Sequence, residues 1–376
     1  MKVVVAPDAF KGSLPAHAAA AALADGWREV RPDDELVEVP LADGGEGTSA
    51  ALESAHPDAL WHDVDVAGPD GRVHPSGWLE LPDGTAVVEL AEACGLPLLA
   101  RPDPLGAHTT GLGQLLRAAA AAGVHRITVG LGGSASTDGA TGALRSLGAR
   151  FLDDDGVELP PGGGPLDRLA RVELEDVVPP PPGGVRCLSD VTAPLLGPDG
   201  AAAVFGPQKG AVADDLVVLE RGLARLADVL AGVVPGAREA VTRPGAGAAG
   251  GTGFGLAVVW GAELVPGADA VAEMLDLDEL LADAAVVLTG EGAFDATSLS
   301  GKVVGSLLAR LPGDVRVGLA AGRVDGPVPT RIAAHRELVA LAGGTDGALG
   351  APAMWLAEAG RELATALGAS TGAAPR

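Results

Sequence analysis

Near its start the chain reads KVVVAPDAFKGS (residues 2–13), and the first apolar residues of this segment are consecutive rather than alternating. A strand with this pattern is buried on both faces, as in a parallel sheet covered by helices. A helix is predicted next, from about Pro15 to Trp27, with Ser13 as its candidate N-cap. The segment therefore predicts the first strand and the first helix of an α/β fold.

The same pattern, an apolar strand that stops at a polar or glycine-rich turn, recurs along the chain. Four more strands are predicted, at LVEVPL (36–41), AAVVLTG (284–290), VRVGLAAG (315–322) and ELVALAGG (337–344). With helices between them, the five strands predict a doubly wound parallel sheet. In the strand order 2-1-3-4-5, ligands bind outside the carboxyl ends of the first and third strands, where the connections leave in opposite directions.

The middle of the chain, about 66–283, is punctuated by proline and glycine. Strands are expected at AVVEL (86–90), RITVGL (126–131) and RVELEDVV (171–178), and helices at Gly111–Ala122 and Asp214–Leu230. We interpret this region as a second α/β domain inserted into the first. The predicted domains are therefore 1–65 plus 284–376, and 66–283.

Composition excludes several classes of protein. The 26 basic and 50 acidic residues give a formal net charge of −24, which would repel nucleic-acid phosphates and anionic membranes. No apolar stretch approaches the roughly 20 residues of a membrane span, and the apolar run at the N-terminus is too short for a signal peptide. Cys94 and Cys187 are far apart and form no disulfide or zinc pattern, so a cytoplasmic protein is expected.

Turns rich in glycine and acids follow three of the predicted strands, at APDAFKGS (6–13), LADGGEGT (41–48) and TGEGAFD (289–295). At the edge of the sheet they would bring together Asp8, Lys11, Asp43, Glu46, Glu291 and Asp295. The simpler alternative is that each is an ordinary turn. Because the chain is acidic, an anionic substrate here would need backbone N–H groups, a few lysines or arginines, or a divalent cation.

A second glycine-rich cluster is VGLGGSASTDGATGALRSLG (129–148), where a predicted strand leads into a helix. Glycines let the backbone approach a ligand, and free N–H groups at a helix start favour an anion such as phosphate. The spacing is neither that of a Walker A loop nor that of a nucleophile elbow. The alternative is a tight strand-to-helix turn capped by serine or aspartate.

Two further segments carry weaker signals. In CLSDVTAPLLGPDGAAAVFGPQKGA (187–211), Asp190 ends a short apolar run and Lys209 stands in a glycine-flanked turn. Lys209 is a candidate for binding phosphate or carboxylate, and the alternative is a solvated surface lysine. The run GAGAAGGTGFG (245–255) lacks dinucleotide-binding spacing, and a flexible linker or hinge is an equal alternative. The seven histidines show no ligand spacing.

Taken together, these segments resemble the bacterial glycerate kinase family, type I. The resemblance rests on APDAFKGSL (6–14), PLADGGEGT (40–48), GLGGSASTDGATG (130–142), DVTAPLLGPDGAAAVFGPQKGA (190–211), GAGAAGGTGFG (245–255) and TGEGAFDATSLSGK (289–302). It implies an ATP- and Mg²⁺-dependent kinase of D-glycerate, with a flavodoxin-like domain that carries a restriction-enzyme-like α/β domain. The chain departs from the family at Ala193, where asparagine is usual, and at Ala293-Phe294, where Arg-Ile is frequent.

A mechanism follows as a hypothesis. Lys11 and Lys209 would contact carboxylate or phosphate, and Asp190, as first choice, or Asp295 would be the general base. The metal ligands would be Asp43, Glu46 and Glu291. Residues that would bind substrate or phosphate are Asp8, Gly44, Gly45, Gly132, Gly133, Ser134, Ser136, Thr137, Asp138, Gly290 and Lys302.

Rival functions stay open at this stage. GLGGSAS (130–136) is similar to the phosphate loop GLGSSAS of the galactokinase and homoserine kinase group, although the doubly wound pattern does not suit that fold. A non-catalytic sensor of an organic acid or nucleotide is the alternative outside enzymes. The resemblance favours 2-phosphoglycerate over 3-phosphoglycerate as the product. The oligomeric state is open, with a homodimer as one alternative.

Overall fold

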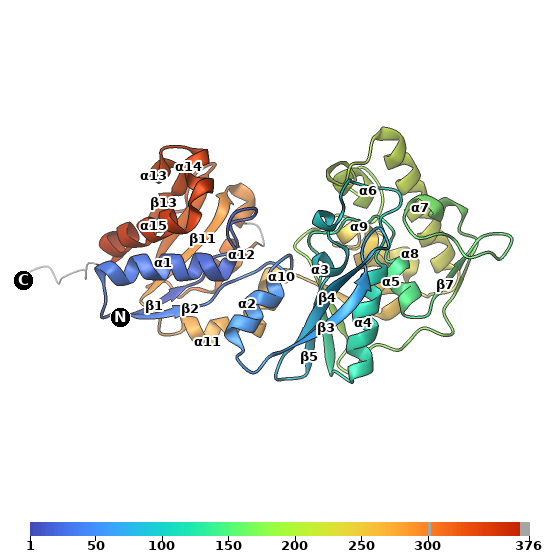
Figure 1. Ribbon diagram of the computed structural model, residues 1–376, viewed down its shortest axis with the longest axis horizontal. Helices are drawn as coiled ribbons and strands as arrows, with labels where there is room; N and C mark the ends of the chain where they lie inside the picture. The colour runs from blue at the N-terminus through green and yellow to red at the C-terminus, as the bar shows by residue number, and fades with distance from the viewer. Residues whose placement is uncertain (300–301, 369–376) are drawn as a thin grey trace, which may run out of the picture. The chain divides into compact units, whose positions relative to one another are not determined.

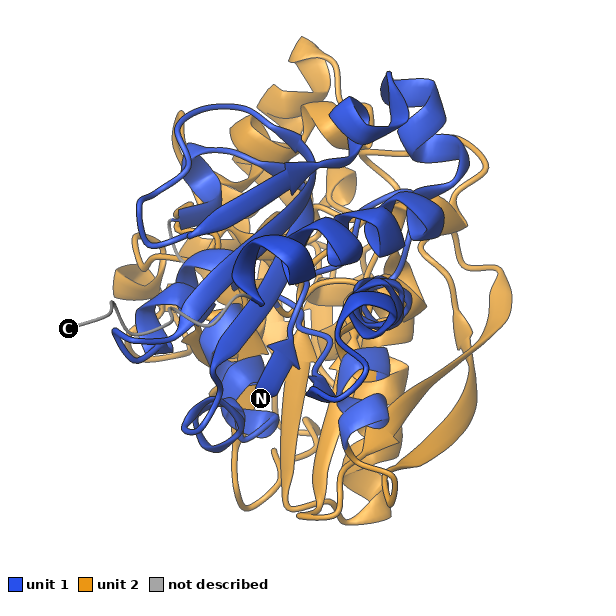
Figure 2. Ribbon diagram, turned by 90° about the vertical axis from the view of Figure 1, so that its left-hand side faces the viewer, with its two compact units in different colours: residues 1–43, 50–55, 268–376 blue, residues 44–49, 56–267 orange. Residues whose placement is uncertain are grey.

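The computed structural model describes residues 1–299 and 302–368. They form two compact units (Figure 2). Unit 1 comprises Met1–Asp43, Ala50–Ala55 and the described residues from Ala268 onward, and unit 2 comprises Gly44–Ser49 and His56–Gly267. Residues 268–283, which the sequence analysis assigned to the inserted domain, thus belong to unit 1, and residues 44–49 and 56–65, which it assigned to the first domain, belong to unit 2. Both units contain sheets and helices, so the predicted α/β class is confirmed.

Unit 1 contains a sheet of five parallel strands (Figure 1). Its strands are β1 (Lys2–Val5), β2 (Glu35–Glu38), β11 (Val286–Phe294), β12 (Arg316–Val324) and β13 (Ala334–Glu337), in the order β13-β12-β11-β1-β2. This is the predicted 2-1-3-4-5 order. The consecutive valines Val3, Val4 and Val5 are fully buried, as a strand covered on both faces requires.

Helices cover both faces of this sheet. They are α1 (Ala16–Val30), α10 (Gly267–Met274), α11 (Leu277–Leu281), α12 (Val303–Arg310), α13 (Leu338–Ala342), α14 (Thr345–Gly350) and α15 (Pro352–Leu367), with α2 (Thr48–Ala55) divided between the units. On one face Leu23, Trp27 and Leu363 form a core with Val5 and Leu288. On the other, a core forms around Phe294, Val304, Val317 and Leu319.

Two local predictions in unit 1 were wrong. The strand predicted at 337–344 is mostly helix α13, and the fifth strand lies just before it. A short apolar run does not distinguish a strand from a helix, and the leucines and alanines here are good helix formers. Ser13 does not cap α1, because its hydroxyl donates to the carbonyl of Phe10 and the helix begins after Pro15.

Unit 2 contains a mixed sheet of six strands. They are β3 (Leu60–Ala67), β4 (Val73–Glu80), β5 (Thr85–Glu89), β6 (Arg126–Gly130), β9 (Val185–Leu188) and β10 (Glu263–Val265), in the order β10-β9-β6-β5-β4-β3. Strands β5, β6, β9 and β10 are parallel to one another, whereas β3 and β4 are antiparallel to their neighbours. A separate pair, β7 (Arg150–Leu152) and β8 (Arg171–Glu173), replaces the longer strand predicted at 171–178.

The helices of unit 2 include both that were predicted. They are α3 (Leu90–Cys94), α4 (Thr110–Ala122), α5 (Thr141–Ser146), α6 (Ala201–Phe205), α7 (Ala213–Ala231), α8 (Ala237–Ala240) and α9 (Ala248–Trp260). The glycine run 245–255 is not a linker, because it is largely buried. It leads into α9 through a kink at Ala249, Gly250 and Gly251, whose φ angles are positive. Among the residues described, no helix is long and apolar enough to cross a membrane.

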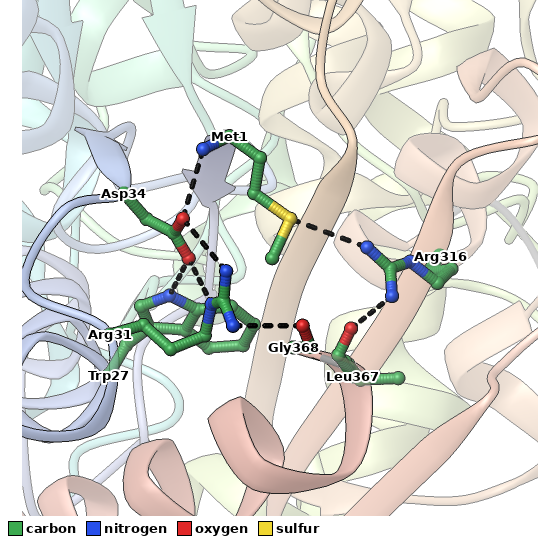
Figure 3. Close-up of polar contacts among 7 residues, drawn as sticks. All are labelled: Met1, Trp27, Arg31, Asp34, Arg316, Leu367 and Gly368. Carbon is green, nitrogen blue, oxygen red and sulfur yellow. Dashed lines mark hydrogen bonds and ion pairs between the residues drawn. The ribbon is translucent and has the colours of Figure 1, made fainter. Parts of the chain in front are cut away.

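A polar cluster ties together the ends of unit 1 (Figure 3). The carboxylate of Asp34 accepts hydrogen bonds from the Met1 amino group (2.9 Å), Trp27 Nε1 (3.0 Å) and Arg31 Nε (2.6 Å). These donors hold the pKa of Asp34 well below its usual range, the Arg31 hydrogen bond contributing most. Arg31 also donates to the carbonyl of Gly368 (2.9 Å), which follows α15.

We expect Asp34→Asn to destabilise unit 1 by about 1–3 kcal/mol, because it leaves the partly buried cationic donors Met1 and Arg31 with a weaker acceptor. Since the pKa of Asp34 is lowered in the folded state, its contribution is present above pH 4 and is lost at lower pH. Calorimetry at pH 7 should therefore give a lower unfolding temperature for Asp34→Asn than for wild type. At pH 3 the difference between the two unfolding temperatures should be smaller. The exposed neighbour substitution Asp33→Asn is the matched control, and an equal effect of both would contradict the prediction.

Candidate active site

Unit 1 contains a cavity of about 430 Å³ at the carboxyl ends of β1, β11 and β12. Six of the candidate site residues from the sequence line it, and so does Arg323, a charged residue that the sequence analysis did not single out. The six are Asp8, Lys11, Asp43, Glu291, Asp295 and Lys302. The loops after the first and third strands of the sheet thus meet at one cavity, as expected for the point where the connections diverge.

Three charges interact at one side of this cavity. Lys11 Nζ lies 3.3 Å from the carboxylate of Asp43. Burial raises the pKa of Asp8 to about 7, with a further contribution from Asp43 that Lys11 partly offsets. Burial alone would lower the pKa of Lys11, but Asp43 and Asp8 outweigh it and the pKa is raised. Asp8 therefore changes charge near neutral pH, while Lys11 remains a cation.

Glu291 and Asp295 differ in their surroundings. Glu291 is 9% exposed, and its Oε1 has no hydrogen-bond partner among the residues described. Burial raises the pKa of Glu291, although Ser298 and Lys302 oppose the shift. Asp295 instead accepts from both the N–H and the hydroxyl of Thr297 at 2.7 Å, and these bonds lower its pKa. Glu291 thus has an oxygen available for a cation, and Asp295 is held as a turn cap.

The predicted residue Gly290 has a packing role in the sheet. A Cβ atom at this position would lie 2.2 Å from the carbonyl oxygen of Ala320 on the neighbouring strand β12. Lys302, at the start of α12, donates to the hydroxyl of Thr297 at 2.8 Å.

In unit 2, the two glycine-rich loops predicted to bind phosphate pack backbone to backbone. A Cβ atom at Gly132 would lie 2.5 Å from Cα of Gly45, and one at Gly130 would lie 2.6 Å from the carbonyl of Gly44. Gly44 itself has φ +81° and fits against Leu188. The loops after β2 and β6, separated by more than eighty residues in the sequence, are therefore neighbours.

Glu89 holds the first of these loops and was missed in the sequence analysis. It ends β5, is 3% exposed, and accepts from the N–H groups of Gly47 (2.9 Å) and Ser49 (2.5 Å). Burial raises the pKa of Glu89, and these two N–H groups oppose the shift. The loop that carries Glu46 is fixed in this way. An acid at the end of the otherwise apolar AVVEL was the available sequence signal.

The second loop, residues 132–138, rests on buried polar groups. Oδ2 of Asp138 accepts from the N–H and hydroxyl of Thr109 (3.0 and 2.9 Å) and from the N–H of Gly142 (3.0 Å). Oδ1 of Asp138 and the hydroxyl of Thr137 have no partner in the described part of the chain. Gly133 has φ +73°, and the hydroxyls of Ser134 and Ser136 lie 3.1 Å apart.

Lys209 is not a solvated surface lysine, so that alternative was wrong. Its side chain is 2% exposed, and its Nζ donates to the carbonyl of Ser136 in the loop. Burial lowers the pKa of Lys209 to about 8, with Asp138 acting in the opposite direction. A lysine at a glycine-flanked turn looks exposed from sequence alone, because the neighbours that bury it lie far along the chain.

Asp190 follows β9, and its Oδ1 accepts from the N–H of Gly267 at 2.7 Å, at the start of α10. Of the three predicted metal ligands, Asp43 and Glu291 line the cavity of unit 1, whereas Glu46 belongs to unit 2. Within residues 1–299 and 302–368, no three His, Cys, Asp or Glu side chains lie close enough to hold a metal ion together.

A doubly wound sheet with lysines and acids at its ligand-binding edge is typical of α/β proteins that bind small charged molecules. Comparison with known proteins gives the family. The chain belongs to the glycerate kinase family, whose model matches residues 3–367. It is a glycerate kinase, a phosphotransferase that uses glycerate and ATP, as the sequence predicted.

Individual relatives agree with this assignment. The chain is 42% identical to glycerate 2-kinase of Escherichia coli K12 over 81% of this chain and 80% of that protein. It is also 42% identical to a glycerate kinase of Bacillus subtilis 168, over 86% and 85% of the two chains. A crystal structure provisionally assigned as glycerate kinase 2 of Salmonella typhimurium LT2 superposes with a TM-score of 0.82 at 35% identity, covering 98% of each chain.

The raised pKa of Asp8 gives a prediction about pH. Folding binds a proton at this carboxyl between about pH 4 and pH 7, so the stability that depends on Asp8 falls as the pH rises through that window. Asp8→Asn removes the ionisable group and should stabilise unit 1 at pH 8 by about 1–4 kcal/mol. Calorimetry in metal-free buffer should show a smaller gain at pH 4.5. A gain that is independent of pH would refute this account of Asp8.

The hydrogen bonds of Glu89 give another prediction. Glu89→Ala removes the acceptor for two N–H groups and should cost about 2–4 kcal/mol. Amide hydrogen exchange of residues 44–49 should become faster. Glu92→Ala, a substitution of an exposed acid three residues later, is the control. Unchanged exchange of the loop in Glu89→Ala would show that other contacts hold it.

Proposed function

We propose that the protein transfers the γ-phosphoryl group of ATP to the 2-hydroxyl of D-glycerate, giving 2-phosphoglycerate. The observation that carries the proposal is the family match across almost the whole chain, with 42% identity to a relative named glycerate 2-kinase. The cavity at the edge of the unit 1 sheet supports it, because Lys11 and Lys302 there are suited to carboxylate and phosphate.

We also propose the finer fold that the resemblance implies. Unit 1 would be a flavodoxin-like domain, which its strand order β2-β1-β11-β12-β13 supports. Unit 2 would be the inserted, restriction-enzyme-like domain. A cytoplasmic location is part of the same proposal. It is supported by Cys94 and Cys187, which are buried free thiols whose pKa burial raises to about 12, so that neither is reactive.

Mg²⁺ is proposed as the metal that accompanies ATP. Mg²⁺ is commonly held by one or two carboxylates plus phosphate oxygens, so a cluster of three acids is not required. Glu291 fits this role because its buried Oε1 has no protein partner in the described residues, and Asp43 lines the same cavity. When bound, the ion would offset negative charge on the phosphates. Glu46 is the third candidate, on its loop in unit 2.

The glycine loop 132–138 is proposed to bind phosphate through backbone N–H groups. The N–H of Ser136 already donates to Ser134 Oγ, and that of Ala135 to the carbonyl of Cys94. The N–H groups of Gly132 and Gly133 are among the remaining candidate donors, and no side chain at these two positions hinders the approach of a ligand. Lys209 would act by fixing this loop through the Ser136 carbonyl, and its buried charge would add positive potential behind it.

Asp190 is proposed as the general base that receives the hydroxyl proton of glycerate, as first choice over Asp295. The choice depends on how well each carboxylate can accept a proton. Asp295 accepts two hydrogen bonds from Thr297, which lower its pKa and weaken it as a base. Asp190 is engaged through Oδ1 with Gly267 at the start of α10, so the carboxylate is oriented. Lys11 would contact the substrate carboxylate or a phosphate.

The product is tested by coupling the reaction to enolase, which consumes 2-phosphoglycerate directly. Purified protein with ATP, Mg²⁺ and D-glycerate should give a signal without added phosphoglycerate mutase. A signal that needs the mutase would identify 3-phosphoglycerate and overturn the proposed position of transfer. Other hydroxy acids should give much slower release of ADP.

The general base is tested by Asp190→Asn. The asparagine keeps a side-chain oxygen that can accept the hydrogen bond from the N–H of Gly267. We expect kcat to fall about 10²- to 10⁴-fold, with a much smaller effect for Asp295→Asn. Asp199→Asn, at an exposed position after Asp190 in the chain, is the control. Near-normal turnover of both Asp190→Asn and Asp295→Asn would rule out both assignments.

A further inference from the structure

The cavity of unit 1 has a second kind of lining that the phosphoryl-transfer chemistry does not use. Besides the charged residues, apolar residues from three successive C-terminal helices face it. They are Leu338 and Val339 of α13, Ala348 and Leu349 of α14, and Pro352 of α15. Glycerate carries a carboxylate and two hydroxyls on three carbons, and so has almost no apolar surface to place against these side chains.

This apolar wall is a fixed part of the fold. Leu338 and Ala348 belong to the buried core between the sheet and α1 and α15. The indole of Trp355 on α15 donates to the carbonyl of Gly347 at 3.0 Å, which ties α14 to α15. Leu349, in contrast, is 59% exposed, and exposed aliphatic surface costs about 25 cal/mol per Å² relative to burial. A ligand with an apolar face would recover part of that free energy.

The size of the cavity points the same way. At about 430 Å³ it lies in the range of roughly 300–1,000 Å³ that is typical of sites for drug-sized ligands. A three-carbon acid would occupy only a small part of this volume. Of the two substrates of a glycerate kinase, only ATP has a large flat group, the adenine base, that can cover apolar side chains.

Cations are placed to receive the charged part of the same ligand. Lys11, Lys302 and Arg323 all line the cavity. Lys11 and Arg323 have side chains that are 74% and 63% exposed, and each is paired with a nearby aspartate at 3.3 and 2.6 Å. Exposed ion pairs of this kind are weak, so the cations can turn toward phosphate groups at little cost.

We propose that this cavity binds the nucleoside part of ATP, with the base against Val339 and Leu349 and the phosphates toward Lys11, Lys302 and Arg323. The proposal rests on the proposed function, because it takes ATP as a substrate. The acids Asp8 and Glu291 would repel phosphates in the absence of a cation. Adenosine, which has no phosphates, should therefore bind without Mg²⁺, and ATP should require it.

The kinetic test uses Leu349→Gln, because Leu349 is 59% exposed and lies outside the buried core of unit 1. We expect the KM for ATP to rise about 5- to 10-fold, with the KM for glycerate and kcat unchanged. Leu60→Gln, on β3 of unit 2, is a matched control because Leu60 is 61% exposed, and it should change neither KM. A rise in the KM for glycerate alone would show that the cavity binds glycerate and would overturn the proposal. No change in either KM would also overturn it.

Measurements of adenosine binding distinguish a failure of the nucleoside site from a failure of the proposed function. Adenosine should bind wild type in calorimetry, bind Leu349→Gln more weakly, and inhibit competitively against ATP but not against glycerate. If wild type fails to phosphorylate glycerate yet shows this difference in adenosine binding, the proposed function fails and the nucleoside site stands. If glycerate is phosphorylated but adenosine competes with glycerate, only the nucleoside site fails.

Discussion

The parallel pairing of Val3–Val5 with Val286–Leu288 is the contact on which the rest of unit 1 depends. It joins segments more than 280 residues apart and sets β1 beside β11, with β2 and β12 on their outer sides. Because connections then leave β1 and β11 in opposite directions, their carboxyl ends are not covered by a crossing helix. The cavity with its lysines and acids lies at that uncovered edge. Unit 2 is formed by most of the chain between the two strands.

The protein binds anionic substrates although its own net charge is strongly negative, and the structure provides positive charge close to the candidate sites. A chain of net charge −24 acts on two anionic substrates. Lys11 and Lys302 face the cavity of unit 1, while Lys209 is buried behind the glycine loop of unit 2. In unit 2 the positive charge lies beside the backbone turn that is proposed to hold phosphate, and in unit 1 the lysines themselves are proposed to contact the anion. The acidic surface elsewhere does not cancel these local fields, because exposed charges more than about 10 Å away are screened by salt.

The sequence predicted those features that depend on local pattern. Consecutive valines in 3–5 and 286–287 predicted buried parallel strands, and the strand order followed. The strand at 337–344 failed because a five-residue apolar run satisfies either a helix or a strand until its neighbours are known. Lys209 and Glu89 were misjudged or missed for a related reason. Their burial and their hydrogen bonds come from residues 40 or more positions away, which no local pattern records.

The scarcity of lysine has a practical consequence for chemical labelling. The chain has four lysines, against 22 arginines. Lys209 is buried, and Lys2 and the Met1 amino group are largely covered beside Asp283 and Asp34, whereas Lys11 and Lys302 are exposed at the cavity. Amine-directed reagents applied to the native protein would therefore react mainly at the rim of one cavity. Mass spectrometry of two peptides would then report directly whether that cavity is occupied.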